Sequence, residues 1–205
     1  VVDMQNKDEQ LRQALLKMKA DDLSLREELA SDGSLFEGYH PRMRQLHEAN
    51  AEMLLRIIRQ YGWPGRSLVG EDGAEAAWLI AQHAISLPRL QRQARALIEE
   101  AARRGEAQLW QAAMLEDRIR MFEGRPQLYG TQFDWDENGE MSPYPEIEEE
   151  AKVDERRSAV GLGPLGEDIK SRRAAIRQTV ERTPSDIKQR RKEMDEWARA
   201  VGWRD

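Results

Sequence analysis

The feature that most limits the fold of this chain is a short, nearly apolar stretch at residues 74–85. Only Glu75, Gln82 and His83 are polar within it. A helix that is apolar on almost every side has to be enclosed by other elements. We therefore predict a helix that runs through the middle of a helical domain, with Gln82 and His83 buried. A buried polar group without a partner costs about 1–3 kcal/mol, so other polar side chains are expected to contact this pair.

Apolar residues recur at helical spacing on both sides of this segment, which predicts further amphipathic helices. Four stripes define them: Leu11, Leu15, Met18, Leu25 and Leu29; Met43, Leu46, Met53, Leu54, Ile57, Ile58 and Tyr61; Leu90, Ala94, Leu97, Ile98 and Ala101; and Ala112, Leu115, Ile119 and Phe122. Pro41 and Pro88 stand where two of these helices begin, because the first helical turn has no partner for the N–H that proline lacks.

The hydrophobic period changes from 3.6 to 2 in the next segment. Residues 127–135 alternate between two faces, and Asn138-Gly139 is the strongest short signal for a hairpin turn. Pro143 and Pro145 keep the return strand short and at an edge. We predict a two-stranded β-hairpin near residues 127–144, which has to pack on the helices because such a hairpin is unstable alone.

Two regions of opposite charge follow one another in the second half of the chain. Residues 134–155 hold ten acidic residues and one lysine, a net charge of −9, whereas residues 165–205 carry a net charge of +3. The acidic run from Glu146 is predicted to be helical to about residue 160. The basic region predicts two antiparallel helices with narrow apolar stripes, formed by Leu165, Ile169, Ile176 and Val180, and by Ile187, Met194, Ala198 and Val201.

These elements predict a mainly α fold, namely a helical bundle with a small two-stranded β-hairpin and a C-terminal helical hairpin. The predicted domain division is a helical core domain at residues 1–165 and a C-terminal helical pair at residues 166–205, an appendage to it. We expect the functional groups to lie in the core domain, where the buried polar residues are.

The composition excludes several classes of protein. The 205 residues include no cysteine, so a disulfide scaffold, a thiolate zinc site, an iron–sulfur cluster and a cysteine nucleophile are ruled out. The net charge of −6 argues against binding to nucleic acid or to an anionic membrane surface. No run of 18 apolar residues occurs, and the first residues do not resemble a signal peptide, so we predict a cytoplasmic protein.

Two apparent motifs have the wrong residue at a position that the motif requires. Residues 134–139 imitate the first half of an EF-hand loop, but the position of its bidentate glutamate is Pro145. Residues 65–70 have the glycine spacing of a phosphate loop, but Glu71-Asp72 stands where a lysine and a hydroxyl residue are needed. An exposed acidic hairpin and a structural turn are the better interpretations.

The chain has three histidines, and two of them belong to no recognisable pattern. His40 and His47 lack an HExxH spacing or an accompanying carboxylate pattern, and we predict that they are isolated surface residues. The sequence therefore predicts no metal site and no cofactor. His83 is the histidine that we expect in the interior.

The candidate site collects polar residues from the apolar helices and from the strand that follows them. Its members are Gln82, His83, Asp117, Arg118, Gln127, Tyr129 and Gln132. We assign His83 to general acid/base work and Asp117 to orienting it or pairing with Arg118, because a carboxylate can fix the tautomer of a neutral imidazole. Arg118 is assigned to anion binding, and the amide and phenol groups to hydrogen bonds with a ligand. The alternative is a network that satisfies itself and fixes the helices.

An ordered set of short motifs resembles a bacterial family of domains of unknown function. The motifs are Gly62-Trp63-Pro64, Val69-Gly70, Gln82-His83-Ala84, Asp117-Arg118, the run from Gln127 to Gln132, Val153-Asp154, Arg156-Arg157 and Gly161-Leu162. This GWP…QHA…DR…YGTQ signature covers residues 50–162. The resemblance implies a mostly helical domain with its signature residues gathered around the QHA helix, and it implies no particular activity.

Two functional hypotheses follow from the sequence. The first is a metal-independent small-molecule enzyme or ligand-binding domain with a pocket centred on His83; if it is an enzyme, we expect acid/base chemistry of the hydrolase or lyase type. The second is a non-enzymatic interaction or regulatory module that acts through the acidic segment and the C-terminal helices, as a homodimer or with a protein partner. The same charges would also fit simple solvated helix faces.

Overall fold

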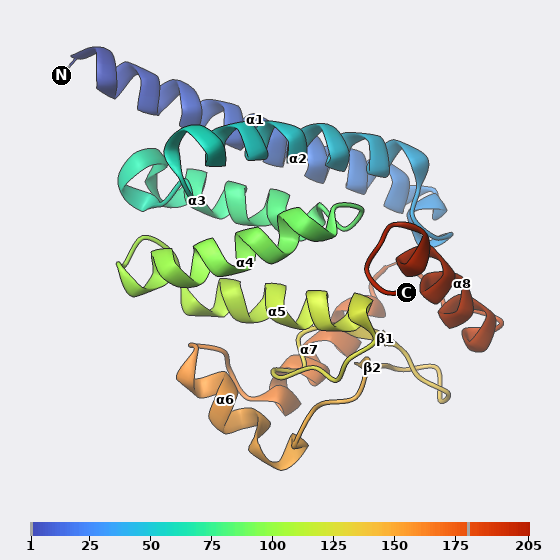
Figure 1. Cartoon of the computed structure of the whole chain (residues 1–205). Helices are drawn as coiled ribbons and strands as arrows, with labels where there is room; N and C mark the ends of the chain where they lie inside the picture. Colours follow the sequence, from blue (N-terminus) through green and yellow to red (C-terminus); the bar gives the residue numbers. More distant parts are fainter. Residues whose placement is uncertain (1, 180) are drawn as a thin grey trace. The chain divides into compact units, whose positions relative to one another are not determined.

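The apolar segment that was predicted to be central forms the second half of α3 (Arg66–His83) in a computed structural model, which describes residues 2–179 and 181–205. Side chains are described from residue 8 onward, except at residue 180. The chain divides into two compact units, Val1–Gln111 and Ala112–Asp205. The described residues are mainly helical and include one two-stranded sheet, as predicted (Figure 1).

Helices surround α3 in the first unit. It is contacted by α1 (Val2–Ser31), α2 (Pro41–Tyr61) and α4 (Pro88–Arg103), and a 3-10 turn, η1 (Ser34–Phe36), follows α1. Figure 1 shows α1 and α2 running alongside α3. The buried apolar side chains in the second half of α3 are mostly short: Ala74, Ala76, Ala77, Ile80 and Ala81. Short side chains let neighbouring helices approach closely, and the prediction of a central helix is confirmed.

The end of α3 determines where its polar residues lie. The helix stops at His83, two residues before the predicted end, and Ala84 has the non-helical angles φ −74° and ψ 44°. The fully buried Gln91 of α4 donates from Nε2 to the carbonyl oxygens of Ala81 and Gln82, at 2.8 and 2.9 Å. The last carbonyls of a helix lack the full set of partners that interior carbonyls have, so Gln91 completes the last turn and holds it in place.

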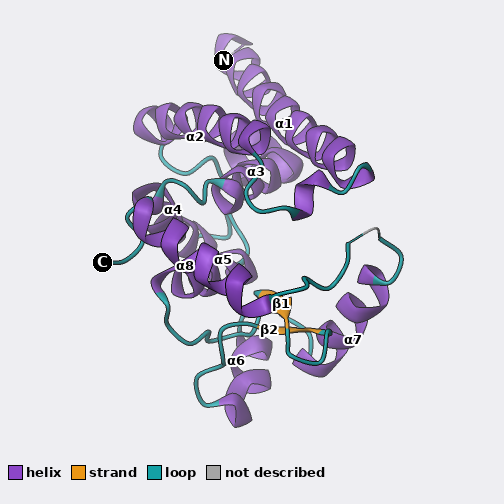
Figure 2. Ribbon diagram, turned by 90° about the vertical axis from the view of Figure 1, so that its right-hand side faces the viewer, coloured by secondary structure: helices purple, strands orange, loops and turns teal. Residues whose placement is uncertain are grey.

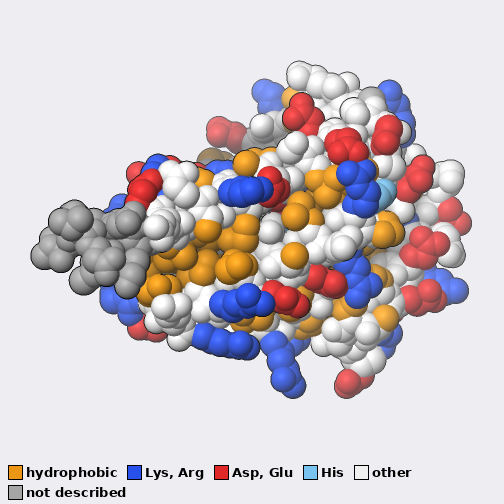
Figure 3. Space-filling view, turned by 90° about the horizontal axis from the view of Figure 1, so that it is seen from above, with side chains coloured by type: hydrophobic (Ala, Val, Ile, Leu, Met, Phe, Trp, Pro, Cys, Tyr) orange, Lys and Arg blue, Asp and Glu red, His pale blue; other side chains and the backbone are white. Residues whose placement is uncertain are grey.

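The outer face of α1 and α2 is mixed in character. Leu23 and Met53 are 44% and 42% exposed, and Figure 3 shows apolar side chains between charged ones on the face that these helices form. Arg12 fixes α1 to α3 through two bonds to Asp72, of 2.8 and 2.5 Å. Within residues 2–179 and 181–205, none of the helices combines the length and apolar character that crossing a membrane requires.

The second unit contains the hairpin and the C-terminal helices. α5 (Leu109–Glu123) begins in the first unit and continues in the second. Strands β1 (Phe133–Trp135) and β2 (Met141–Pro143) pair antiparallel, with Phe133 opposite Pro143. The remaining helices are α6 (Val153–Ala159), α7 (Leu165–Ile176) and α8 (Ile187–Ala200). Figure 2 shows the strands beside α7, which contacts β2. The division predicted between residues 165 and 166 therefore falls inside this unit. Val180, which was assigned to a helical stripe, lies outside the described residues.

Two predicted elements are shorter than expected. Residues 127–132 form no strand, and their β-type pairing is limited to an isolated bridge between Gln127 and Ile147. Their backbone N–H groups instead donate to the side chain of Asp117, which competes with a strand ladder. The helix predicted from Glu146 begins only at a 3-10 turn, η2 (Glu150–Lys152), and continues as α6.

The opposite charges of the second unit pair with one another. Arg173 of α7 contacts Glu140 in the hairpin at 2.5 Å, and Arg190 of α8 contacts Asp134 at 3.1 Å. Asp134 is 7% exposed at its side chain, so the ion pair with Arg190 is partly shielded from water. The basic C-terminal helices thus neutralise the acidic hairpin within the same chain.

Candidate functional site

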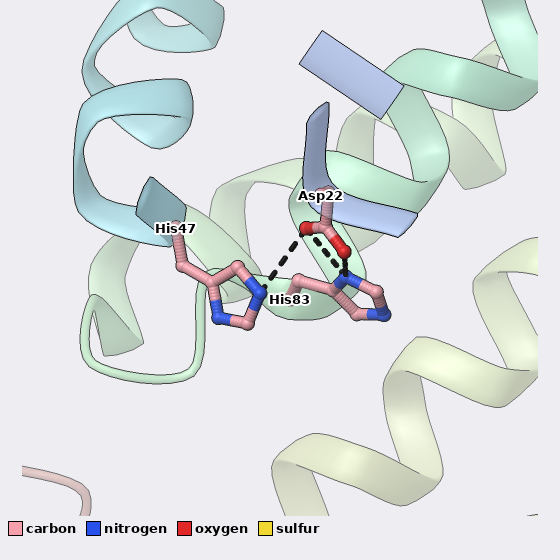
Figure 4. Close-up of side chains that lie close together, drawn as sticks. All are labelled: Asp22, His47 and His83. Carbon is pink, nitrogen blue, oxygen red and sulfur yellow. Dashed lines mark hydrogen bonds and ion pairs between the residues drawn. The ribbon is translucent and has the colours of Figure 1, made fainter. Parts of the chain in front are cut away.

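Three polar side chains meet inside the first unit, one from each of three helices. Asp22 comes from α1, His47 from α2 and His83 from the last position of α3, and Figure 4 shows the carboxylate of Asp22 between the two imidazole rings. The exposed fractions of these side chains are 1%, 7% and 17%. We call these three residues the Asp22 cluster. Asp22 and His47 are buried, whereas His83, which was predicted to be buried, is only partly so.

Asp22 accepts from the ring of His83, and the ring of His47 lies at ion-pair distance. Nδ1 of His83 lies 2.9 and 2.8 Å from the two carboxylate oxygens, and Nε2 of His47 lies 3.1 Å from Oδ2. Burial would raise the pKa of Asp22, but the hydrogen bonds from His47 and His83 outweigh it and hold the pKa well below its usual value. Asp22 is therefore ionised at neutral pH.

An ionised carboxylate only accepts hydrogen bonds, and this fixes the proton of the His83 ring on Nδ1. The hydroxyl of Tyr39 lies 2.8 Å from Nδ1 of His47 and donates to it when that ring is neutral. Burial raises the pKa of the Tyr39 hydroxyl, so it keeps its proton. Polar contacts thus run from Tyr39 through His47 and Asp22 to His83, by hydrogen bonds at both ends and by a 3.1 Å contact between His47 and Asp22.

This arrangement can perform proton transfer at one atom. With Nδ1 of His83 protonated and held by Asp22, the lone pair of the neutral ring lies on Nε2, where it can accept a proton. The carboxylate also stabilises the imidazolium that this transfer would form. The ring centroids of His47 and His83 are 5.0 Å apart, so a charge on one ring is close to the other.

The carboxylate that was predicted to orient His83 has another role. Asp117 belongs to the second unit, whereas the carboxylate that contacts His83 within the first unit is Asp22. Asp117 is completely buried and accepts from the N–H groups of Leu128, Tyr129 and Thr131, at 2.7, 3.2 and 2.9 Å, and from the Thr131 hydroxyl at 2.9 Å. Burial raises the pKa of Asp117 although these donors oppose it. Its contacts make it the organiser of the loop at residues 127–132.

The amide and guanidinium groups predicted to bind a ligand hold the same loop. Gln127 is completely buried and donates from Nε2 to the carbonyls of Gln132 and Pro145, while its Oε1 accepts from the Gln132 N–H at 2.7 Å. The Gln132 side chain accepts from Nε of Arg118 at 3.1 Å. The carbonyl of Tyr129 accepts from Arg157 at 2.7 Å. These residues form one network in the second unit.

The seven predicted site residues therefore fall into two groups. Gln82 and His83 lie in the first unit, and Gln82 is 3% exposed, as expected for the central helix. Asp117 and the four ligand-binding candidates Arg118, Gln127, Tyr129 and Gln132 lie in the second unit. The partner of His83 in the Asp22 cluster is a residue that the sequence analysis did not select.

The prediction that His40 and His47 are isolated surface residues is wrong for His47. His47 is 7% exposed and sits between Tyr39 and Asp22. His40 precedes α2 and its Nδ1 accepts from the N–H of Arg42 at 3.2 Å, a helix-capping contact. A signal for His47 and Asp22 was present in the sequence, because both stand on the apolar stripes of their helices, where a polar residue becomes buried.

The Asp22 cluster also has the residue types of a metal site. One ligand atom from each of its three side chains can be chosen so that all three atoms lie within 4.8 Å of one another. Two imidazole nitrogens and a carboxylate oxygen are ligands that zinc and related ions accept. The expectation of no metal site was based on His47 being an isolated surface residue, and that basis is lost.

Comparison with known proteins places the chain in a family. The sequence profile of a family of unknown function, DUF6624, matches residues 9–180. The chain belongs to this family. The resemblance seen in the sequence, over residues 50–162, is confirmed as a resemblance to a family of unknown function, and the DUF6624 match extends further at both ends, so that it includes Asp22. No curated protein and no solved structure matches the chain.

Proposed function

We propose that this DUF6624 chain is a small-molecule enzyme or ligand-binding domain in which His83 is the working group and Asp22 its orienting carboxylate. The single observation that supports this most strongly is the pair of contacts, 2.8 and 2.9 Å long, between Nδ1 of His83 and the buried Asp22 carboxylate. Such a pair fixes the tautomer that leaves Nε2 free of a proton, which a general base requires.

The proposed chemistry is proton transfer or water activation of the hydrolase or lyase type. His83 would take a proton at Nε2 while Asp22 balances the positive charge that develops on the ring. His47, which itself contacts the hydroxyl of Tyr39, lies 3.1 Å from Oδ2 of Asp22 and would limit the rotation of the carboxylate. The proposed chemistry uses protein groups alone. Nε2 of His83 takes the proton, and Asp22 sets the tautomer by holding the proton on Nδ1. We further infer a bacterial, cytoplasmic protein, in keeping with the sequence predictions.

Two other interpretations compete with this proposal. In the first, the Asp22 cluster only fixes α1, α2 and α3 to one another. In the second, the chain is an interaction module, but the ion pairs of Arg173 with Glu140 and of Arg190 with Asp134 already account for the opposite charges that suggested it. A homodimer or protein partner at the C-terminal helices stays a prediction of the sequence alone.

A comparison of two asparagine variants tests the proposal. The amide nitrogen of asparagine can take the place of the imidazole Nδ1, so His83→Asn keeps a donor for Asp22 and removes the base at Nε2. His40→Asn is the matched control, because His40 lies outside the Asp22 cluster. A small-molecule library is screened by thermal shift against the wild type and both variants, and compounds that bind are then tested for turnover.

We expect at least one compound to raise the melting temperature of the wild type and of His40→Asn but less so that of His83→Asn. Any turnover should be lost in His83→Asn alone. The proposal is contradicted if every compound that stabilises the wild type stabilises His83→Asn equally and is converted at the same rate.

A further inference from the structure

We propose that Asp22, His47 and His83 form a binding site for one divalent transition-metal ion of the zinc type. This inference goes beyond the proposed function, because metal binding at the Asp22 cluster does not require His83 to act as a base. The donor atoms are Nδ1 of His83, Nε2 of His47 and one carboxylate oxygen of Asp22.

The spacing of these atoms suits a single small ion. His83 Nδ1 and His47 Nε2 lie 2.8 and 3.1 Å from Oδ2 of Asp22. Ligand atoms around a tetrahedral zinc ion with bonds of about 2.0 Å are roughly 3.3 Å apart. These two separations differ from that value by up to about 0.5 Å, and all three ligand atoms lie within 4.8 Å of one another, so the side chains would have to rotate to admit the ion.

The charge around Asp22 is also that of a cation site. The carboxylate is 1% exposed, and among the described residues its polar partners are the two imidazoles, with no lysine or arginine. Two neutral rings leave a net charge of −1 in a buried place, where an uncompensated charge is costly. A divalent ion supplies positive charge at the position where two N–H groups now converge.

Tyr39 would stabilise His47 in the metal-bound form, because its hydroxyl contacts the ring nitrogen that does not bind the ion. Histidines that bind a metal through one nitrogen usually make a hydrogen bond with the other. The Tyr39 hydroxyl lies 2.8 Å from Nδ1 of His47. A hydroxyl both donates and accepts, so it can donate to Nδ1 without the metal and accept from a protonated Nδ1 with the metal. The contact is satisfied in both states.

The donor set selects the class of ion. Magnesium and calcium prefer six or more oxygen ligands, whereas two imidazoles and one carboxylate suit zinc, cobalt or nickel. Three helices, α1, α2 and α3, supply one ligand each, which holds the ligands on rigid elements. A fourth position would be left for water or a ligand, as in catalytic zinc sites.

Metal binding changes what His83 can do. When Nδ1 binds the ion, the proton of the neutral ring moves to Nε2, and the ring is no longer a base. The Asp22 cluster then has a proton-bound state, which supports acid/base chemistry by His83, and a metal-bound state, in which chemistry would pass to the ion and its water ligand. The proton stays on the His83 ring and moves from Nδ1 to Nε2, so the change from one state to the other adds the metal ion and removes no proton from the ring.

The test uses zinc and cobalt salts on the whole chain after treatment with a chelator. Calorimetry with zinc should give one ion per chain for the wild type and for His40→Ala. Asp22→Asn and His47→Ala should bind zinc about 100-fold more weakly or worse, because loss of one of three protein ligands exceeds the 10–100-fold effect of changes in the surrounding shell. Cobalt in the wild type should give the visible absorption of a tetrahedral site.

X-ray absorption spectroscopy of the zinc-loaded wild type keeps the inference testable when a variant fails to fold. Two imidazole ligands per zinc support it. Fewer than two imidazoles, no stoichiometric binding, or equal binding by Asp22→Asn overturns it. The two proposals fail separately: a chain that binds no zinc but loses its compound response in His83→Asn refutes only the metal site, and a chain that binds zinc with an unchanged response refutes only the proposed function.

Discussion

Asp22→Asn is the change that most directly tests how the Asp22 cluster is held together. In the wild type the carboxylate accepts from His83 and lies 3.1 Å from Nε2 of His47. Asparagine offers one carbonyl oxygen and one amide donor, so it keeps an acceptor for one ring and presents an N–H to the other. About one hydrogen bond to a charged group is lost, which is worth roughly 1.5–3 kcal/mol. We expect the free energy of unfolding at pH 7 to fall by about that amount.

The pH dependence gives this prediction a second signature. The folded-state pKa of Asp22 is lower than its ordinary value of about 3.9, so its contribution to stability is complete above that value. The contribution is lost as the pH falls from about 4 toward the lower folded-state pKa. The difference between the wild type and Asp22→Asn should therefore be fully present above about pH 4 and shrink below it.

Urea unfolding at several pH values measures both effects, with the fluorescence of the tryptophans and circular dichroism followed together. Asp21→Asn is the matched control: Asp21 is the neighbouring residue of α1, its side chain is 48% exposed, and it pairs with Lys17 at 2.5 Å. Surface pairs contribute little, so the control should stay within about 0.5 kcal/mol of the wild type. Equal stability of Asp22→Asn and the wild type at pH 7, with parallel pH curves, would refute the charge assignment.

Four further changes have expected outcomes. Asp117→Asn should lower the free energy of unfolding, measured by denaturant unfolding, by about 2–4 kcal/mol, because it turns a donor toward buried N–H groups of the 127–132 loop. Thr131→Val removes two hydrogen bonds of the hydroxyl, one to Asp117 and one from Gln132, and should cost about 1–2 kcal/mol in the same experiment. Tyr39→Phe should weaken zinc binding by roughly 10-fold in calorimetry and leave the ion-to-chain ratio unchanged. Gly70→Ala should lower stability by about 1–2 kcal/mol, since φ is 72° there, and a neutral result in a melting experiment would contradict it.

The sequence was informative where burial follows from spacing. The near absence of polar residues from 74–85 was enough to place α3 in the centre of its unit. The prolines at positions 41 and 88 marked the starts of α2 and α4. Burial on these helices depends on local periodicity, which is visible without knowing the partner. Gln82 was correctly expected to be buried for the same reason.

Partners across long separations were not visible in the sequence. His83 and Asp22 are 61 positions apart, and a stripe of apolar residues shows that a polar member is buried but not what it contacts. Asp117 was a plausible partner for His83 because it also stands on a largely apolar helix. Its side chain is saturated by the loop that follows, and the same contacts explain why residues 127–132 do not form the predicted strand.

The positions of Asp22 and His47 on their stripes bear on whether the Asp22 cluster is only structural. Each occupies an interior position where the stripe would otherwise have an apolar residue. A purely structural role would be served as well or better by an apolar side chain, since buried charged groups often reduce stability relative to apolar residues of similar volume. A structural carboxylate in this place would also be expected to meet a lysine or arginine. Asp22 instead meets two groups that exchange protons and bind metals near neutral pH. That choice of partners favours a site whose occupant changes, a proton in one state and a metal ion in the other.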